Sequence, residues 1–374
     1  MSLFLHIISF DIPFPANYGG VIDVFFKMVA LKTQGVQIIL HNFQYGDRKP
    51  NLILEQYCAE VHYYPRQISI WKIFSAKPFI VATRNHPNLL KRLQQDNYPI
   101  LFEGLHSCFH IHHFINCDRQ CKVRMHNVEW QYYQNLCDLE TNYLKKIFFK
   151  IESFKLKRFE KQVLKQGATI LTLSPNDTAY FKKLHFDTAL ILPFHGHQRV
   201  TTITGMGAGA LFHGKLSVSD NANAVLYLIE NVFSKTDMPF IIAGQNPSKL
   251  LIDKAKQFKN IQIIKNPDDK TMANLIQNAQ IQILLSFQTA GLKLKLLNAL
   301  FAGRHCIVNT PMIENTGLES LCHIADTAEI MLKCLFELQY EPFSLLMVEQ
   351  RRIILENVFS DQANAKKLML PLLV

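Results

Sequence analysis

The chain of 374 residues contains no run of about 18 uncharged apolar residues, so the sequence is not expected to form a membrane-spanning helix. Its first residues, MSLFLHIISFD, include neither a basic segment nor a small-residue cleavage site, and they are interpreted as a β-strand rather than a signal peptide. An apolar fraction of 48% with 19% charged residues excludes a disordered chain. The length is too great for one ordinary core and suits two.

The sequence also lacks the cysteine pattern of a disulfide framework. The eight cysteines are scattered, which is typical of reduced thiols, and we therefore expect a cytoplasmic protein. Cys117 and Cys121 lie close in sequence to four histidines between residues 106 and 113. Their spacing fits no standard zinc pattern, so no metal site is expected.

The balance of charge is basic, with a net charge of +10. This excess favours anionic partners, but it does not distinguish nucleotide phosphate, a membrane surface and nucleic acid. The basic residues are spread through the chain, and no RNP, helix-turn-helix or finger pattern occurs. Nucleic acid is therefore not an expected partner, and a salt-dependent gel shift would overturn that expectation.

Strands and helices are predicted to alternate twice along the chain. In the first half the strand candidates, most of them separated by helical stretches, are residues 3–10, 37–43, 61–65, 99–104, 122–127, 169–174 and 189–194. In the second half they are residues 211–216, 240–244, 261–265, 281–286, 306–309 and 323–325. Such alternation indicates parallel, doubly wound sheets. The predicted fold class is α/β, with two Rossmann-like domains.

A break separates the two series of elements. Residues 196–210 are rich in glycine and threonine and contain few large side chains, so we expect them to form an interdomain linker. The domains are accordingly predicted at residues 1–195 and 211–355, with a cleft between them.

The stretch 281–309, IQILLSFQTAGLKLKLLNALFAGRHCIVN, is the most informative part of the sequence. An apolar strand is followed by a short loop, then by a helical pattern that Gly303 ends, and then by a second strand. Lys293 and Lys295 are predicted in the first turn of the helix, where a cation is electrostatically unfavourable. Free backbone N–H groups gather at the same place. A bound anion would offset the unfavourable charge, and phosphate is the obvious candidate.

The same stretch resembles a known site. From Gly291 to Gly303 the sequence G-x-K-x-K-L-L-N-A-L-x-A-G is similar to the nucleotide-sugar site of GT-B glycosyltransferases of family 4, which usually carries G-x-R-L-K-hydrophobic-L-E-A-M-x-A-G. The resemblance implies that Gly291, Lys293 and Lys295 bind the donor. Asn298 falls on the glutamate that usually binds the donor ribose. The other glutamate of the usual E-x7-E pair falls on Ala290, so both carboxylates are missing.

Further motifs extend the resemblance over nearly the whole chain. Gly19 and Gly20 follow the first strand, where the family's glycine loop faces the donor diphosphate. Gly214 lies in a motif similar to F-x-G-x-hydrophobic, and it is a further candidate for donor binding. The other similar segments, in the correct order, are residues 122–130, 173–177, 221–224 and 243–244.

The candidates for catalytic residues lie at or near the ends of predicted strands. His106 ends the fourth strand at the position where the family often carries a catalytic-site histidine, and Glu103 and His126 are the other catalytic candidates. Arg124 could bind an acceptor phosphate, although an arginine in a strand often only extends its charged end to solvent. The candidates for acceptor binding are Tyr18, Arg124 and Glu129.

The resemblance implies a glycosyltransferase that moves a sugar from a nucleoside-diphosphate sugar to a glycan or lipid-linked acceptor, with retention of configuration. It implies no divalent cation and no cofactor beyond the donor substrate, because the two lysines and the helix start can stabilise the leaving diphosphate. No DxD-type cluster occurs in the sequence. It also implies that a terminal helix, residues 356–374, crosses back onto the first domain.

Two alternatives of this fold stay open. A degenerate nucleotide-sugar-binding protein would explain Ala290 and Asn298, and donor hydrolysis or transfer by the purified protein would exclude it. A sugar-nucleotide epimerase would need groups that move protons, and Glu103, Glu129 and His106 could supply them.

The segment 143–165, YLKKIFFKIESFKLKRFEKQVLK, is basic and amphipathic. It is interpreted either as a solvated helix packed on the sheet or as a helix that docks on an anionic membrane face. Phe148, Phe149 and Phe154 are expected to pack against the first sheet. We therefore expect reversible electrostatic adsorption at the inner membrane face, without deep insertion.

Overall fold

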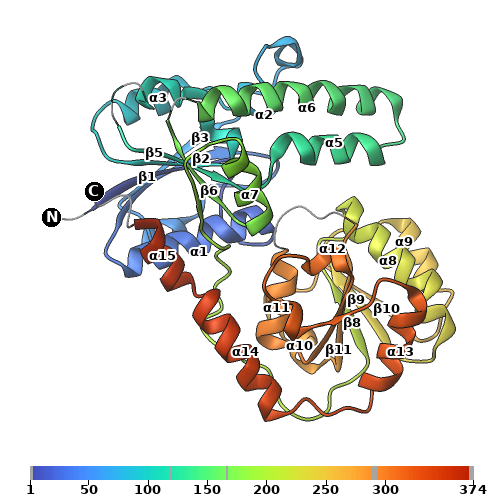
Figure 1. The fold of residues 1–374 in the computed structure, drawn as a ribbon. Helices are drawn as coiled ribbons and strands as arrows, with labels where there is room; N and C mark the ends of the chain where they lie inside the picture. Colours follow the sequence, from blue (N-terminus) through green and yellow to red (C-terminus); the bar gives the residue numbers. More distant parts are fainter. Residues whose placement is uncertain (1–2, 116, 118, 166, 288–292, 370–374) are drawn as a thin grey trace. The chain divides into compact units, whose positions relative to one another are not determined.

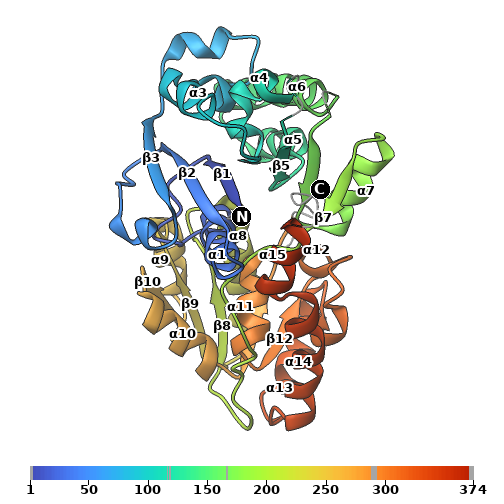
Figure 2. The ribbon, with the colours of Figure 1, turned by 90° about the vertical axis from the view of Figure 1, so that its left-hand side faces the viewer.

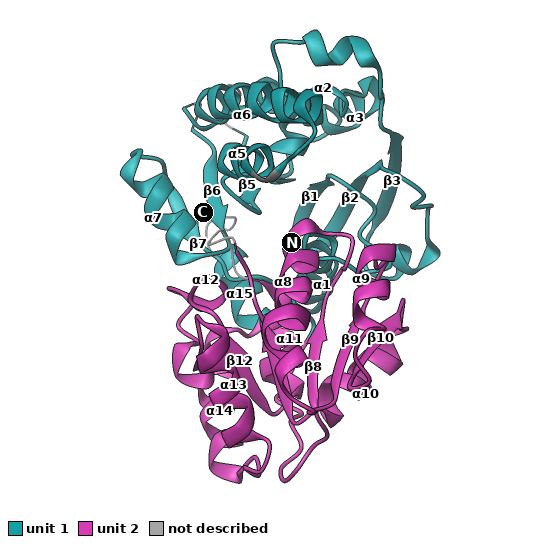
Figure 3. Cartoon of the chain, turned by 90° about the vertical axis from the view of Figure 1, so that its right-hand side faces the viewer, with its two compact units in different colours: residues 1–196, 361–374 teal, residues 197–360 magenta. Residues whose placement is uncertain are grey.

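The computed structural model describes residues 3–115, 117, 119–165, 167–287 and 293–369. The chain folds into two compact units, which Figure 3 colours separately. Unit 1 comprises Met1–Gly196 and Asp361–Val374, and unit 2 comprises His197–Ser360. Each unit contains one parallel sheet with helices on both faces, so the predicted α/β class with two doubly wound sheets is confirmed.

Unit 1 is built on a seven-stranded sheet in the order β3-β2-β1-β4-β5-β6-β7. Figure 2 shows β3, β2 and β1 side by side. The strands are β1 (Phe4–Ser9), β2 (Gln37–Gln44), β3 (Glu60–Pro65), β4 (Ile100–Glu103), β5 (Cys121–Met125), β6 (Thr169–Thr172) and β7 (Thr188–Leu190). All of them pair in parallel. The helices are α1 (Gly19–Thr33), α2 (Phe79–Ala82), α3 (Pro87–Leu93), α4 (His112–Ile115), α5 (Glu129–Leu139), α6 (Tyr143–Leu164), α7 (Pro175–Lys183) and α15 (Asp361–Met369), with short 3-10 turns η1 (Leu52–Gln56), η2 (Ile70–Phe74) and η3 (Leu105–His110).

Alternating residues of each strand fill the cores on the two faces of this sheet. Leu5 and Ile7 of β1 pack with α1 and with α15, which contributes Leu368. Ile8 of β1 faces the opposite core with Leu156 of α6. The C-terminal helix α15 therefore belongs to the first sheet, and Thr33 Oγ1 donates to Gln362 Oε1 at 2.9 Å beside it.

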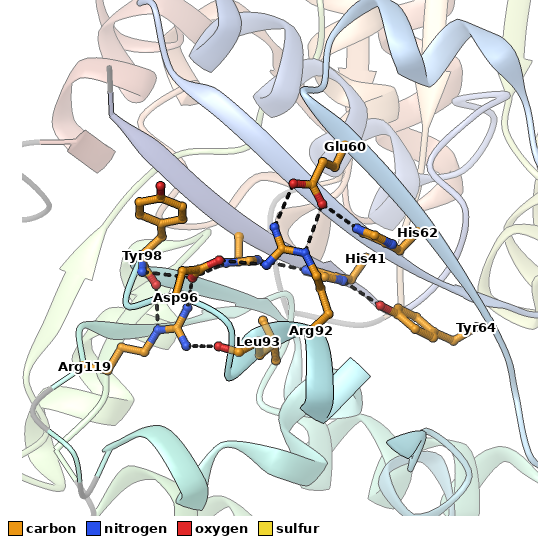
Figure 4. A network of polar contacts seen from close by, with 10 residues as sticks. His41, Glu60, His62, Tyr64, Arg92, Leu93, Asp96, Tyr98 and Arg119 are labelled. Carbon is orange, nitrogen blue, oxygen red and sulfur yellow. Dashed lines mark hydrogen bonds and ion pairs between the residues drawn. The ribbon is translucent and has the colours of Figure 1, made fainter. Parts of the chain in front are cut away.

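A buried polar network crosses β1, β2 and β3 (Figure 4). His6 Nε2 lies 2.9 Å from Asp96 Oδ1, His6 Nδ1 lies 2.9 Å from His41 Nε2, and His41 Nδ1 lies 2.9 Å from the Tyr64 hydroxyl. Because the carboxylate can only accept, each ring donates in one direction, and both histidines are neutral. Burial lowers the pKa of His6 to about 4, with Asp96 opposing the shift, and burial also lowers the pKa of His41 well below its usual value.

Helices α5 and α6 lie side by side in unit 1 (Figures 1 and 2). Leu156, Phe159 and Val163 form the buried face of α6. Phe154 is 71% exposed, so the expectation that it packs against the sheet is wrong. It lies two positions from Leu156, or about 200° around a helix of 3.6 residues per turn, and therefore faces away from the core.

Unit 2 is built on a six-stranded parallel sheet in the order β10-β9-β8-β11-β12-β13. The strands are β8 (Ala210–His213), β9 (Phe240–Gly244), β10 (Ile261–Lys265), β11 (Ile281–Leu284), β12 (His305–Val308) and β13 (His323–Ile324). The helices are α8 (Ser219–Asn231), α9 (Lys249–Ala255), α10 (Asp269–Asn278), α11 (Leu294–Ala302), α12 (Thr310–Ile313), α13 (Ala328–Leu338) and α14 (Leu345–Val358), with short turns η4 (Phe233–Lys235) and η5 (Glu319–Leu321).

The segment expected to be a linker is part of unit 2. Thr201 N donates to Phe301 O at 2.7 Å, and Ala208 N donates to Asn278 O at 2.9 Å. Gly205 forms an antiparallel bridge with Phe343. Low side-chain content suggested a free connection, but backbone hydrogen bonds, which do not depend on side chains, hold the segment in place. Within the described residues, no helix combines the length and the apolarity needed to cross a bilayer.

Candidate active site

Both sheets have a topological switch point, where the order of strands reverses direction. In unit 1 this point lies between β1 and β4, and in unit 2 it lies between β8 and β11. In open α/β sheets, ligands bind outside the carboxyl ends of the strands at such points. Most of the predicted site residues that the structure describes lie near the carboxyl ends of β1, β4, β5, β8 and β11 or at the start of the helix that follows, whereas Arg124 lies within β5 and Asn298 in the middle of α11.

At the switch point of unit 1, a chain of buried charges supports His126. Its Nε2 lies 3.0 Å from Glu103 Oε2, and the other Glu103 oxygen lies 2.7 Å from Lys27 Nζ. Lys27 also contacts Asp23 at 2.9 Å. Burial of Glu103 works against ionisation, yet Lys27 and His126 hold its pKa below the usual value. Glu103 has no exposed surface and contacts His126 directly, and its role as a catalytic group stays a prediction.

Arg124 completes this chain and is fully buried. Its guanidinium donates to both oxygens of Asp23, at 2.8 and 3.2 Å, and to the carbonyl oxygens of Ile191 and Leu192, at 2.5 and 3.1 Å. The prediction that Arg124 binds an acceptor phosphate is therefore wrong. β5 points this side chain at α1, and the carboxylate of Asp23 takes the place of an anionic ligand.

The same cluster contains groups of the kind that bind cations. Ligand atoms of Asp23, Glu103 and His126 lie within 4.8 Å of one another. The ammonium group of Lys27 already bridges the two carboxylates, at 2.9 and 2.7 Å. A metal ion would have to displace a buried, paired cation, so these residues do not fit a metal.

His106 and Glu129 form the second part of the unit 1 site. His106 Nδ1 lies 4.0 Å from Glu129 Oε1, and 23% of the His106 side chain is exposed. Burial lowers the pKa of His106 well below its usual value, with Arg84 adding to the effect. Burial raises the pKa of Glu129 to about 8, with Arg84 opposing the shift. At neutral pH both groups are therefore predominantly uncharged, and the carboxylic acid can donate a hydrogen bond.

Glycine at position 104 allows this arrangement. Gly104 has a φ of 67°, in the left-handed region, and a Cβ atom there would lie 2.9 Å from His106 Nδ1. Arg84, which sequence reasoning did not identify, is buried next to the site. It donates to Phe10 O at 3.0 Å, and burial lowers its pKa to about 9.

The loop after β1 holds the remaining unit 1 candidates. The Tyr18 hydroxyl donates to Asp11 Oδ2 at 2.7 Å, so this candidate for acceptor binding is tied to the loop itself. Gly19 begins α1 and is exposed. A Cβ atom on Gly20 would lie 2.7 Å from the Phe10 ring, so glycine lets the start of α1 approach this ring closely.

In unit 2, Lys295 lies in the first turn of α11. Its Nζ donates to Asn221 Oδ1 at 2.7 Å and to Leu285 O at 3.1 Å. Burial lowers the pKa of Lys295 to about 8, with Asp220 opposing the shift and Lys293 adding to it. Lys293 occupies the N-cap position and donates to Pro311 O at 3.1 Å. Two cations thus gather at the positive end of α11, as predicted from the sequence.

Local hydrogen bonds hold this cation site in place. Asp220 at the start of α8 accepts from Ser286 Oγ at 2.9 Å and from Phe287 N at 2.8 Å. This arrangement joins α8 to the end of β11. Gly214 lies so close to Gly244 that a Cβ atom on the latter would be 1.8 Å from the Gly214 carbonyl oxygen. The prediction for Gly291 concerns a residue outside the described part of the chain, as does the one for Ala290.

Asn298 lies one turn after Lys295. Its Oδ1 accepts from His197 Nε2 at 2.9 Å, and the His197 ring stacks on Phe301 with 4.9 Å between centroids. A neutral amide with a histidine partner therefore stands where the resembling family has a carboxylate. His197 has no signal in the local sequence, because 101 residues separate the two partners.

Comparisons with known proteins concern the fold. No model of a known protein family matches the sequence. An uncharacterised 44.6 kDa protein in the cps region of Klebsiella pneumoniae is 24% identical over 331 residues, covering 83% of this chain and 84% of the relative. A sucrose-phosphate synthase from Thermosynechococcus elongatus has a similar structure, with a TM-score of 0.69 and 13% identity over 98% of this chain and 97% of its own. Anabaena HepE, in complex with UDP and glucose, gives a TM-score of 0.63 and 8% identity, covering 99% of both chains.

Proposed function

We propose that this chain, which has the GT-B fold, is a glycosyltransferase that moves a sugar from a nucleoside-diphosphate sugar to a glycan or lipid-linked acceptor. The observation that carries the proposal is the position of Lys295, a half-buried cation with a lowered pKa at the start of α11, beside the switch point of unit 2. We propose a uridine diphosphate sugar as the donor, because HepE is known in complex with UDP and glucose.

The donor reaction requires stabilisation of a leaving group. The bond between the anomeric carbon and the diphosphate oxygen breaks and its electron pair goes to the diphosphate. An acceptor hydroxyl oxygen forms the new bond, and its proton passes to an oxygen of the leaving diphosphate. Lys295, Lys293 and the N–H groups of the α11 start face this growing charge in the proposal. Preorganised cations act without a divalent metal, so we propose a metal-independent reaction. We also propose retention of configuration, because the resemblance to family 4 implies it.

The acceptor side of the proposal rests on unit 1. Neutral His106 and protonated Glu129 offer hydrogen bonds to sugar hydroxyls without adding charge. His126, held by Glu103, is proposed to contact the transferred sugar. The Klebsiella relative lies in a cps region, which supports a polysaccharide acceptor.

A second function is favoured by one observation. Asn298, paired with His197, replaces the carboxylate that would bind the donor ribose in the resembling family. A protein that binds nucleotide sugars without transferring them would tolerate this change.

A thermal-shift screen with UDP-, GDP- and ADP-sugars tests the proposal. A ligand at about 100 times its Kd should stabilise the protein by about 2.7 kcal/mol. Stabilisation by a UDP-sugar, followed by donor hydrolysis or transfer, supports the transferase. Stabilisation without any turnover supports the binding protein, and the absence of stabilisation by all three donors contradicts both.

A further inference from the structure

Helix α6 of unit 1 presents a second apolar stripe on the side opposite its buried face. The stripe consists of four residues spaced three, four and three positions apart, which places them on one face of a helix. Their side chains are exposed to solvent: Leu144 77%, Ile147 40%, Ile151 48% and Phe154 71%. A surface helix needs one apolar face, and α6 already buries one, so the second stripe is unexplained by the fold.

A neighbouring segment enlarges this surface. The turn η2 exposes Ile70 at 70%, Trp71 at 77% and Phe74 at 80%, and the rings of Trp71 and Phe74 lie 6.3 Å apart. Two contacts hold the segment against the middle of α6. Lys155 Nζ donates to Ile73 O at 2.6 Å.

The second contact is between the start of α2 and α6, where Phe79 N donates to Glu152 Oε2 at 2.6 Å. In Figures 1 and 3 the segment around η2 projects beyond the layer of helices α2 and α6. We refer to the four stripe residues of α6 with Ile70, Trp71 and Phe74 as the apolar ridge.

The exposed charges of α6 and of residues 61–95 have one sign. Both acidic residues of α6, Glu152 and Glu160, are buried, at 0% and 1% exposure. No aspartate or glutamate occurs between Glu60 and Asp96, the part of the chain that contains η2. The exposed cations of α6 are Lys145, Lys146, Lys150, Lys157, Arg158 and Lys161.

We propose that the apolar ridge is a docking surface for an anionic lipid bilayer. Large exposed apolar patches mark interaction sites. Trp, Phe and long aliphatic side chains flanked by lysines match the boundary between acyl chains and headgroups, while the lysines contact lipid phosphates. A protein partner with an acidic rim would need the same cations, but it would not require an aromatic pair that projects from the surface.

The inserted groups are Trp71, Phe74 and Phe154. This differs from adsorption through charge alone, because the apolar contribution persists when salt screens the lysines. The docking surface does not depend on the transferase reaction, so the failure of one proposal would leave the other unaffected.

Tryptophan fluorescence of the full chain tests insertion. The chain contains two tryptophans, Trp71 and Trp130. Trp130 is half-buried and donates to the Tyr180 hydroxyl at 2.8 Å, so Trp130→Phe leaves Trp71 as the single exposed probe. With vesicles that contain phosphatidylglycerol, the emission of Trp71 should shift to shorter wavelength and be quenched by brominated acyl chains. Vesicles of phosphatidylcholine alone should give weaker binding.

Variants separate the two contributions to binding. Trp71→Ser with Phe74→Ser should weaken binding to anionic vesicles by at least about tenfold, which corresponds to the loss of two inserted rings. The matched control changes Phe336 and Tyr340 to Ser, because these residues of unit 2 are 70% and 74% exposed. Lys146→Glu with Lys150→Glu should weaken binding at low salt, whereas Lys249→Glu with Lys256→Glu, exposed lysines of unit 2, should not.

Two results would overturn the proposal. One is a Trp71 emission spectrum that does not change on anionic vesicles at low salt, in a sample whose circular dichroism shows a folded protein. The other is concentration-dependent self-association that shields Trp71 without lipid, which would assign the apolar ridge to a second copy of the chain.

Discussion

Charged side chains are arranged differently at the switch points of the two units. In unit 1 the charged side chains satisfy one another: Lys27 bridges Asp23 and Glu103, and the latter holds His126. In unit 2 the cations gather at a helix N-terminus, and carbonyl and amide oxygens are the partners that hold Lys295. The first arrangement is closed and suited to neutral sugar hydroxyls. The second leaves net positive charge and is suited to a diphosphate.

The largest effect is expected when the buried charge cluster of unit 1 is disrupted, and it should appear as a loss of stability. Lys27→Met leaves two buried carboxylates facing each other, and such a change should lower the free energy of unfolding by about 3–5 kcal/mol. Urea denaturation measures this loss. Lys32→Met, on an exposed position of the same helix, should change stability by less than about 0.5 kcal/mol. Equal stability of the two variants would contradict the buried network.

The corresponding change in unit 2 should affect turnover rather than folding. Lys295→Ala removes a preorganised charge from the leaving diphosphate and should reduce the rate by about two to three orders of magnitude. Lys249 is the matched control, since it is an exposed lysine in the first turn of α9, away from the switch point. Initial rates of donor hydrolysis or transfer provide the measurement. A folded Lys295→Ala protein with unchanged kinetics would remove this residue from the site.

The next prediction concerns the histidine network of unit 1. The pKa of His6 is about 4 in the folded state and about 6.5 when unfolded, so unfolding takes up a proton between these values. The stability contributed by neutral His6 is present above pH 6.5 and is lost as the pH falls toward 4, by about 1.4 kcal/mol per pH unit. Urea denaturation from about pH 7 to about pH 4 should show a shallower slope for His6→Gln. An unchanged slope would show that other groups take up the proton.

The smallest effect is expected from Glu129. Its pKa of about 8 means that the acid form donates at neutral pH, and activity should fall about tenfold one pH unit above this value. Glu129→Gln keeps a donor at every pH, so its rate profile should retain only the decline caused by deprotonation of Lys295, whose pKa is also about 8. Rates measured from about pH 6 to about pH 9.5 test the difference. A wild-type decline that is no steeper than the decline of Glu129→Gln would exclude the role.

The comparison also explains what sequence reasoning could find. The site in unit 2 is a contiguous strand–loop–helix segment, so the spacing of Lys293 and Lys295 after an apolar strand predicted a cation site at a helix start. Strand periodicity and alternation likewise predicted both parallel sheets. These features are local, and the chain order alone brings the residues together.

Unit 1 depends on contacts between distant parts of the chain. Arg124 meets Asp23 across 101 residues, and a single sequence does not indicate that the arginine is neutralised rather than exposed. Lys27 lies four residues after Asp23, a spacing that could have suggested the ion pair. Phe154 is exposed because the buried face of α6 lies on another side of the helix. The composition of a helix rich in aromatic residues does not show which of its faces is buried.

The central claim is that the start of α11 binds a nucleoside diphosphate through Lys295. Isothermal titration of UDP, UMP and uridine into the wild-type protein and into Lys295→Ala tests it directly, without requiring turnover. The wild-type protein should bind UDP at least about tenfold more tightly than UMP, and Lys295→Ala should remove that preference. Equal affinity of the wild-type protein for UDP and uridine, or an unchanged preference in Lys295→Ala, would contradict the account.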